Sequence, residues 1–124
     1  DGVVDVYLSD FKYGNDECAL RLSSLPNYFR IISRNHMLAG KQADLLIRHL
    51  VMPNHIECDS KPILDWITEN LDNNVRVNIM SQYRPEYKAL EYSDINRRLN
   101  REEYFSVLEH ARKIGLWNIE TQKI

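Results

Sequence analysis

Residues 45–54 read Leu-Leu-Ile-Arg-His-Leu-Val-Met-Pro-Asn, a short apolar run that ends in two turn-forming residues. The length of the run and its branched side chains predict a buried strand over residues 45–52. Strands of this kind are typical of parallel sheets that helices cover. The run therefore favours an α/β fold, and its two polar members, Arg48 and His49, need an explanation.

Helical patterns lie on both sides of this strand. Before it, apolar residues recur at helical spacing from Pro26 to Gly40, and Gly40 stands where a C-terminal cap belongs. After it, an N-cap at Asp59 or Ser60 followed by Pro62 predicts a second helix that closes near residues 73–74. One apolar face of that helix comprises Ile63, Ile67 and Leu71, flanked by Trp66.

Two further strands complete the pattern. Residues 3–8 predict a first strand, followed by a polar loop over residues 9–16. Residues 75–81 alternate apolar and polar side chains and predict a third strand, which Pro85 stops. A chain that starts inside a strand resembles a fragment of a longer protein, with the edge of the first strand free to pair with another chain or a second copy of itself.

The last helix has the clearest signal. After a short helical piece around residues 93–99, Asn100 and Glu103 form a capping-box pattern ahead of a helix that ends at Gly115. The order strand, helix, strand, helix, strand, helix predicts an α/β segment of three β-α units with parallel strands. Three such units are about half of a (β/α) barrel or a small open sheet.

Composition narrows the function classes. A chain of 124 residues predicts one domain spanning residues 1–124. With 16 Lys and Arg against 18 Asp and Glu, the net charge of −2 disfavours nucleic-acid binding. Apolar runs are too short for a membrane helix, so no membrane association is expected. The two cysteines, Cys18 and Cys58, fit a reducing cytoplasm and show no metal-binding spacing.

Ligands of parallel α/β folds bind beyond the carboxyl ends of the strands, so the residues at those ends are the candidates. Asp10 and Lys12 are two apart and would share a side if the first strand continued through them. They would then offer a carboxylate and an ammonium group to one ligand. The alternative is a surface ion pair of little energy.

Arg48 and His49 point to opposite faces of their strand. A guanidinium within an apolar run needs a carboxylate, a phosphate or a water-lined cavity, so Arg48 is either a ligand contact, the partner of an acidic residue on a neighbouring strand, or an edge residue. His49 is interpreted as a hydrogen-bonded structural residue. The histidines at positions 36, 55 and 110 are scattered along the sequence and indicate no metal site.

The end of the third strand offers Gln82 and Arg84 on one face and Tyr83 on the other. These residues either add hydrogen-bond donors to the ligand site at the carboxyl ends of the strands or cap the sheet. The sequence shows no glycine-rich phosphate loop, no nucleophile elbow and no Cys and His pair at a spacing useful for catalysis. Cys18 is interpreted as incidental, because no activating neighbour is evident in the sequence.

Three phrases, residues 1–14, 46–53 and 77–85, resemble the C-terminal half of radical S-adenosylmethionine proteins, in the group similar to pyruvate formate-lyase activating enzyme. The resemblance continues through residues 95–99 and 101–104 to Gly115. It therefore covers nearly the whole chain in the expected order.

The resemblance implies part of a (β/α)6 barrel, a [4Fe-4S] cluster on a CxxxCxxC loop, and S-adenosylmethionine that is cleaved to a 5′-deoxyadenosyl radical. A glycyl-radical enzyme or another protein substrate would be the partner. The residues implied as cofactor contacts are Asp10, Lys12, Arg48, Leu50 and, at the third strand, Gln82 or Tyr83. Asp10 and Lys12 match polar contacts to the ribose and the methionyl carboxylate, and Leu50 a packing contact.

The chain departs from that family in one important respect, because it contains no CxxxCxxC motif and no glycine-rich cofactor strand. Without thiolate-held iron there is no electron donor, so these 124 residues are expected to be inactive alone. Two alternatives stay open. The chain is a non-catalytic interaction module that pairs through its sheet edge, or an α/β domain that binds an anionic metabolite through Lys12, Arg48 and Arg84.

Overall fold

The computed structural model describes residues 6–42, 44–71, 75–116 and 118–123. Its strands and helices, in chain order, are β1 (Val6–Asp10), α1 (Asp16–Ser23), α2 (Tyr28–Gln42), β2 (Asp44–Leu50), the π-helical turn η1 (Ile56–Ser60), α3 (Lys61–Asn70), β3 (Arg76–Met80), the 3-10 turn η2 (Tyr87–Glu91), α4 (Arg101–Lys113) and β4 (Ile119–Glu120).

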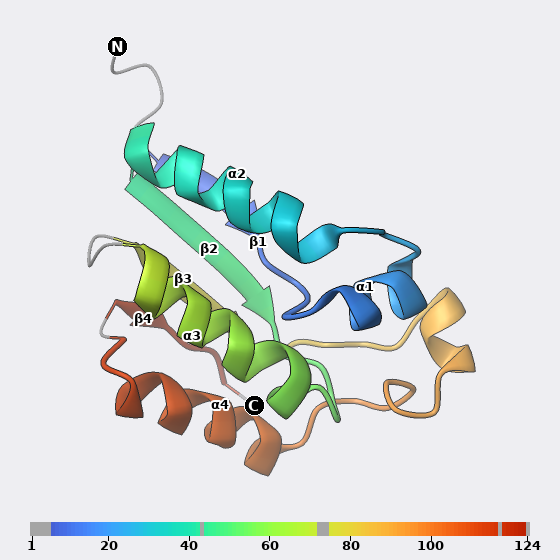
Figure 1. Cartoon of the computed structure of the whole chain (residues 1–124). Coiled ribbons are helices and arrows are strands. Elements are labelled where there is room, and N and C mark those ends of the chain that lie inside the picture. Colours follow the sequence, from blue (N-terminus) through green and yellow to red (C-terminus); the bar gives the residue numbers. More distant parts are fainter. Residues whose placement is uncertain (1–5, 43, 72–74, 117, 124) are drawn as a thin grey trace.

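The strands form one parallel sheet in the order β1-β2-β3-β4. Each step moves to the next neighbour, and right-handed connections that always step in one direction place their helices on the same face. Figure 1 shows α2, α3 and α4 on the near side of the sheet. The predicted α/β class with parallel strands is confirmed.

The main core lies between the sheet and these three helices. Ile47 of β2 and Ile79 of β3 are fully buried, as are Ile63 of α3 and Val107 of α4. Ile67 is also buried, and Trp66 and Leu71 pack against the same core as predicted. A second cluster, beyond the carboxyl ends of the strands, comprises Tyr13, Cys18, Ala19, Met52, Tyr83 and Ile95.

Local sequence signals explain α4 well. The Asn100 side chain accepts a hydrogen bond from the Glu103 amide at 2.8 Å, and the Glu103 carboxylate accepts one from the Asn100 amide at 3.1 Å. This reciprocal pair is the predicted capping box. Gly115 follows the helix with a φ of 84°, a left-handed conformation that favours glycine.

Several predicted boundaries are wrong. Gly40 lies within α2 instead of capping it, because the helix continues to Gln42. The Ser60 side chain makes no capping bond, since its hydroxyl binds His49 and the π-helical turn η1 leads directly into α3. The helical piece expected at 93–99 is replaced by η2, which ends before it.

Other elements differ at the ends of the sheet. β1 runs to Asp10, which shortens the predicted loop, while residues 3–5 and the predicted helix end at 73–74 lie outside the described residues. The sequence pattern predicts neither α1 nor β4, and β4 has only two residues and therefore no detectable periodicity. In the described parts of the chain, no helix has the length and apolar character needed to cross a membrane.

Candidate functional site

The predicted site residues Asp10 and Arg48 form an ion pair on neighbouring strands. They are register partners in the β1–β2 ladder, and Arg48 Nε donates to Asp10 Oδ1 at 2.8 Å. The side chains of Ile47 and His49, on either side of Arg48, are buried toward the helices, so Arg48 points to the opposite face of the sheet. Both members of the pair reach solvent, with 40% of the Arg48 side chain and 65% of the Asp10 side chain exposed. The expectation of an acidic partner on a neighbouring strand is confirmed.

The pair belongs to a polar row that crosses the sheet. Arg48 is in register with Asn78 of β3, and Asn78 is in register with Glu120 of β4. One position on each of the four strands is therefore polar on the face opposite α2, α3 and α4. This row can provide hydrogen bonds to a polar ligand lying across the strands.

A cavity of 480 Å³ opens beyond the carboxyl ends of β1, β2 and β3. Lys12 lines it from the segment after β1, Leu50 from the end of β2, and Tyr83 and Arg84 from the segment after β3. Lys88 and Glu86 add two further charges. The cavity thus occupies the place where parallel α/β folds bind ligands, and cationic side chains outnumber anionic ones among its lining residues.

Of the remaining predicted contact residues, Lys12 and Tyr83 line the cavity and Gln82 lies away from it. Lys12 does not pair with Asp10, because Asp10 binds Arg48; Lys12 instead faces the cavity, and its Nζ lies 5.4 Å from the centre of the Tyr13 ring. Tyr83 is mostly buried, and this burial raises the pKa of its phenol. Its hydroxyl donates to the Ile95 carbonyl at 2.7 Å. Gln82 is exposed and its amide donates to the Lys123 carbonyl at 3.4 Å, away from the cavity.

The structure confirms that His49 is a hydrogen-bonded structural residue. Its ring is buried between the Phe11 carbonyl, 2.8 Å from Nδ1, and the Ser60 hydroxyl, 2.7 Å from Nε2. Since a carbonyl only accepts, Nδ1 carries the proton and Nε2 accepts from Ser60. Burial lowers the pKa of this imidazole, although the bond to Phe11 opposes the shift. His49 therefore connects β1 to the start of α3.

Four residues that spacing did not connect lie together beside the second cluster. Cys18 of α1 lies beside His55, at the end of the loop after β2, and beside Cys58 and Asp59 of η1, with one donor atom of each within 4.8 Å of the others. Sequence reasoning missed this group because 36 residues separate Cys18 from His55 along the chain. Burial and the Asp59 carboxylate raise the pKa of the Cys58 thiol to about 12, so this thiol is not a nucleophile at neutral pH.

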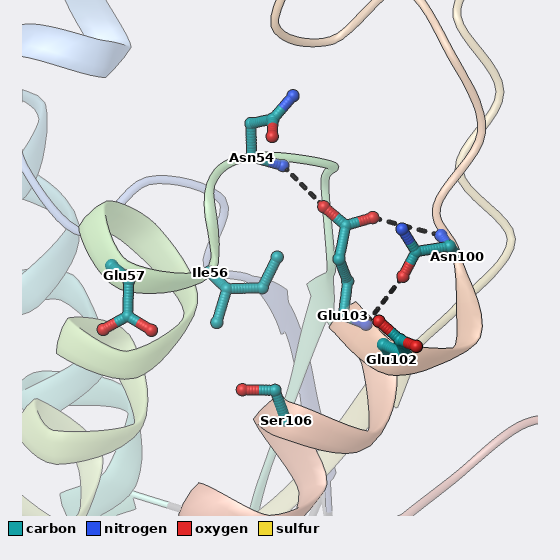
Figure 2. A pocket seen from close by; sticks show the side chains of 7 residues that line it. All are labelled: Asn54, Ile56, Glu57, Asn100, Glu102, Glu103 and Ser106. Carbon is teal, nitrogen blue, oxygen red and sulfur yellow. Dashed lines mark hydrogen bonds between the residues drawn. The ribbon is translucent and has the colours of Figure 1, made fainter.

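A second pocket, of 430 Å³, lies between the loop after β2 and the start of α4 (Figure 2). Its carboxylate Glu103 accepts from the amides of Asn54 at 2.9 Å and Asn100 at 3.1 Å and pairs with Arg97 at 3.0 Å. Burial raises the pKa of Glu103, but Arg97 and the two amides outweigh it and the net shift is downward. Glu103 therefore fastens the loop to the helix and holds no proton for acid catalysis at neutral pH.

Comparison with known proteins adds a relative without a described activity. The chain is 62% identical over 115 residues to an uncharacterized protein of Methanocaldococcus jannaschii. The match covers 93% of this chain and 33% of that protein, so the chain spans about a third of the length of the curated relative it matches. No family model matches the chain.

Proposed function

We propose that this chain is the cofactor-supporting part of a radical S-adenosylmethionine enzyme similar to pyruvate formate-lyase activating enzyme, with Asp10 and Arg48 as contacts to the cofactor. The observation that carries the proposal is the Asp10–Arg48 pair on the face of a parallel sheet opposite α2, α3 and α4. The resemblance of residues 1–14, 46–53 and 77–85 to that family supports it from the sequence.

We propose further that the sheet and its helices are part of a (β/α)6 barrel. Strands in sequential order, with helices on one face, curl so that the opposite face becomes the inside of a barrel. The polar row through Asp10, Arg48 and Asn78 would then face the barrel interior, where a ligand is enclosed. Further β-α units would come from additional polypeptide, which fits a relative three times as long as the matched segment.

The side chains suit the chemical groups of the cofactor. S-Adenosylmethionine carries a carboxylate, an ammonium group and ribose hydroxyls. Arg48 binds Asp10 through Nε, so its two terminal amino groups can bind a carboxylate of the cofactor end-on. The exposed Asp10 carboxylate can accept from ribose hydroxyls or the ammonium group.

If S-adenosylmethionine were bound beside a reduced [4Fe-4S] cluster, the cofactor would supply the radical chemistry of the family, and Asp10 and Arg48 would hold its polar groups. The cluster does not fit the thiols of this chain, because Cys18 and Cys58 are its only cysteines and a cluster of this kind needs at least three clustered thiolates. The role of these residues is therefore to bind and orient the cofactor, while the iron ligands come from elsewhere in the protein.

The whole product of the gene tests this proposal. Produced without oxygen, supplied with iron and sulfide and reduced, it should release 5′-deoxyadenosine from S-adenosylmethionine, and its sequence should contain a CxxxCxxC motif. A whole protein without that motif, or one that holds a cluster and releases no 5′-deoxyadenosine, would refute the proposal. The isolated 124-residue chain should bind the cofactor weakly.

The cavity at the carboxyl edge favours a second candidate, an α/β domain that binds an anionic metabolite. Lys12, Arg84 and Lys88 bring three cationic groups to one cavity, with Glu86 as the acidic residue among the lining. Titration with inorganic phosphate and with a dicarboxylate such as succinate separates this candidate from the first. Tight binding that Lys12→Ala weakens and Arg48→Ala leaves unchanged would favour the metabolite site.

A further inference from the structure

In the group formed by Cys18, His55, Cys58 and Asp59, the three sulfur and nitrogen donors have the separations of a tetrahedral metal site. The two sulfur atoms are 3.8 Å apart, and His55 Nδ1 lies 3.7 Å from Cys18 Sγ and 3.3 Å from Cys58 Sγ. With Zn–S bonds of about 2.3 Å and Zn–N bonds of about 2.0–2.1 Å, a tetrahedron separates two sulfurs by about 3.8 Å and a sulfur from a nitrogen by about 3.5 Å. Three donor atoms are thus already at metal-binding separations.

The surrounding residues orient these donors. His55 Nε2 lies 2.7 Å from Asp94 Oδ2, which directs Nδ1 toward the sulfurs. A carboxylate on the remote nitrogen of a metal-binding imidazole is a common arrangement in zinc proteins. Arg21 in turn holds Asp94, and this pairing lowers the pKa of Asp94 to about 2. The carboxylate therefore stays ionised across the whole physiological range.

The chain around Asn15 fixes the other ligands. Asn15 caps α1 by accepting from the Cys18 amide at 2.8 Å, and its own amide group donates to the Cys58 carbonyl at 2.7 Å. The Gly14 amide donates to Asp59 Oδ1 at 2.7 Å, which leaves Oδ2 facing the cluster. A Cβ on Gly14 would lie 2.7 Å from the Asp59 carbonyl, so the close approach of the two loops requires glycine.

We propose that Cys18, His55 and Cys58, with Asp59 as the fourth ligand, bind one zinc ion that fastens α1 to the loop after β2. Two thiolates with one imidazole and one carboxylate favour Zn²⁺ over Mg²⁺ or Ca²⁺, which prefer oxygen ligands. An iron–sulfur cluster fits less well, because even a [2Fe–2S] centre with two cysteine ligands needs two histidines and this group contains one. The site rests on residues other than Asp10 and Arg48, so it is independent of the proposed function.

One contact has to change when the ion binds. Asp59 Oδ2 lies 2.6 Å from His55 Nδ1, a direct hydrogen bond, whereas two ligands of one zinc ion would be about 3.3 Å apart. Binding therefore releases the proton between these atoms together with the two thiol protons. The Asp59 carboxylate also moves slightly away from His55. The ion would hold one wall of the cavity at the carboxyl edge, because Cys18 packs in the same cluster as Tyr13 and Tyr83.

Cobalt titration of the full 124-residue chain, kept reduced and freed of metal, tests the site. One equivalent of Co²⁺ should give the visible absorption of tetrahedral cobalt and a thiolate-to-cobalt charge-transfer band, and one equivalent of Zn²⁺ should abolish both. Saturation without a charge-transfer band, or a Cys18–Cys58 disulfide that persists under the reducing conditions, would overturn the proposal. This measurement on the unaltered chain does not depend on any variant folding.

Variants assign the ligands. Cys18→Ser and Cys58→Ser should each weaken Co²⁺ binding more than tenfold and reduce the charge-transfer band. Asp94→Asn should weaken binding by about 10–100-fold while keeping the spectrum, as expected for a residue that only orients a ligand. His110→Gln is the matched control, because His110 is half-buried and pairs with Asp65 outside the cluster, and it should bind like the unaltered chain. Equal binding by Cys18→Ser and His110→Gln would overturn the assignment.

Discussion

Acidification should destabilise this protein through two buried imidazoles, His36 and His49. His49 is enclosed by Phe11 and Ser60, while His36 stacks on the Phe11 ring at a centroid distance of 4.9 Å. Burial lowers the pKa of both, although hydrogen bonds to backbone carbonyls oppose the shift. The unfolded chain, whose histidines titrate near pKa 6.5, therefore binds more protons than the folded chain below that pH.

The sign and the size of the effect follow from this difference. Stability is full above about pH 6.5 and falls as the pH drops, by at most about 1.4 kcal/mol per pH unit for each histidine and about 2.7 kcal/mol for both. His55 acts in the opposite sense, because Asp59 and Asp94 outweigh its burial and raise its pKa, so its contribution is lost only above pH 6.5. Carboxylates titrate mainly below pH 5. The window between about pH 5 and 6 thus isolates the two buried rings.

Urea unfolding at several pH values within this window measures the slope. His49→Gln should reduce the slope by about half, whatever its effect on stability at pH 7. Ile67→Ala is the control, since it lowers the free energy of unfolding without removing a titrating group. An identical slope in the unaltered chain and in His49→Gln would refute the reasoning.

Three substitutions test the packing directly. Ile67→Ala should lower the free energy of unfolding by about 2–5 kcal/mol in urea titrations, because the side chain is 1% exposed in the main core; a cost below 1 kcal/mol would contradict that placement. Asn100→Ala should cost about 1 kcal/mol by removing the capping box of α4, and circular dichroism should show slight loss of helix. Tyr104→Phe should cost about 1–3 kcal/mol, because the hydroxyl donates to the Ile79 carbonyl at 2.6 Å and accepts from the Gln122 amide at 2.8 Å; an unchanged melting temperature would argue against both bonds.

The elements that sequence predicts best are those whose signal is local. The capping box at Asn100 and Glu103 acts within four residues, so α4 is correct nearly to the residue. The alternation in residues 75–81 likewise identifies β3. Gly40 fails as a cap because α2 continues to Gln42, and a glycine inside a helix costs only about 1 kcal/mol relative to alanine.

The site residues were predictable only where the signal is local in the sequence. An arginine in an apolar run demands a partner, and the parallel register supplies Asp10 at the matching position of β1. Pairing of Cys18 with His55 and Cys58 depends on how α1 packs against the loop after β2, which no spacing rule contains. The sequence also could not show that Lys12 and Asp10 point to different places. The strand ends at Asp10, so the alternation of side-chain faces does not extend to Lys12.

The measurement that tests the central claim most directly is the affinity of the whole gene product for S-adenosylmethionine in Arg48→Ala, compared with Arg76→Ala. Arg76 lies on β3 two residues before Asn78, toward the amino end of the strand, and pairs with Glu120 at 3.7 Å. Both arginines are about half exposed, so each substitution should cost less than about 1 kcal/mol of stability. Arg48→Ala should weaken cofactor binding by about 10–150-fold, the value of one hydrogen bond to a charged group, and Arg76→Ala should leave it unchanged. Equal affinities in the two variants would contradict the account.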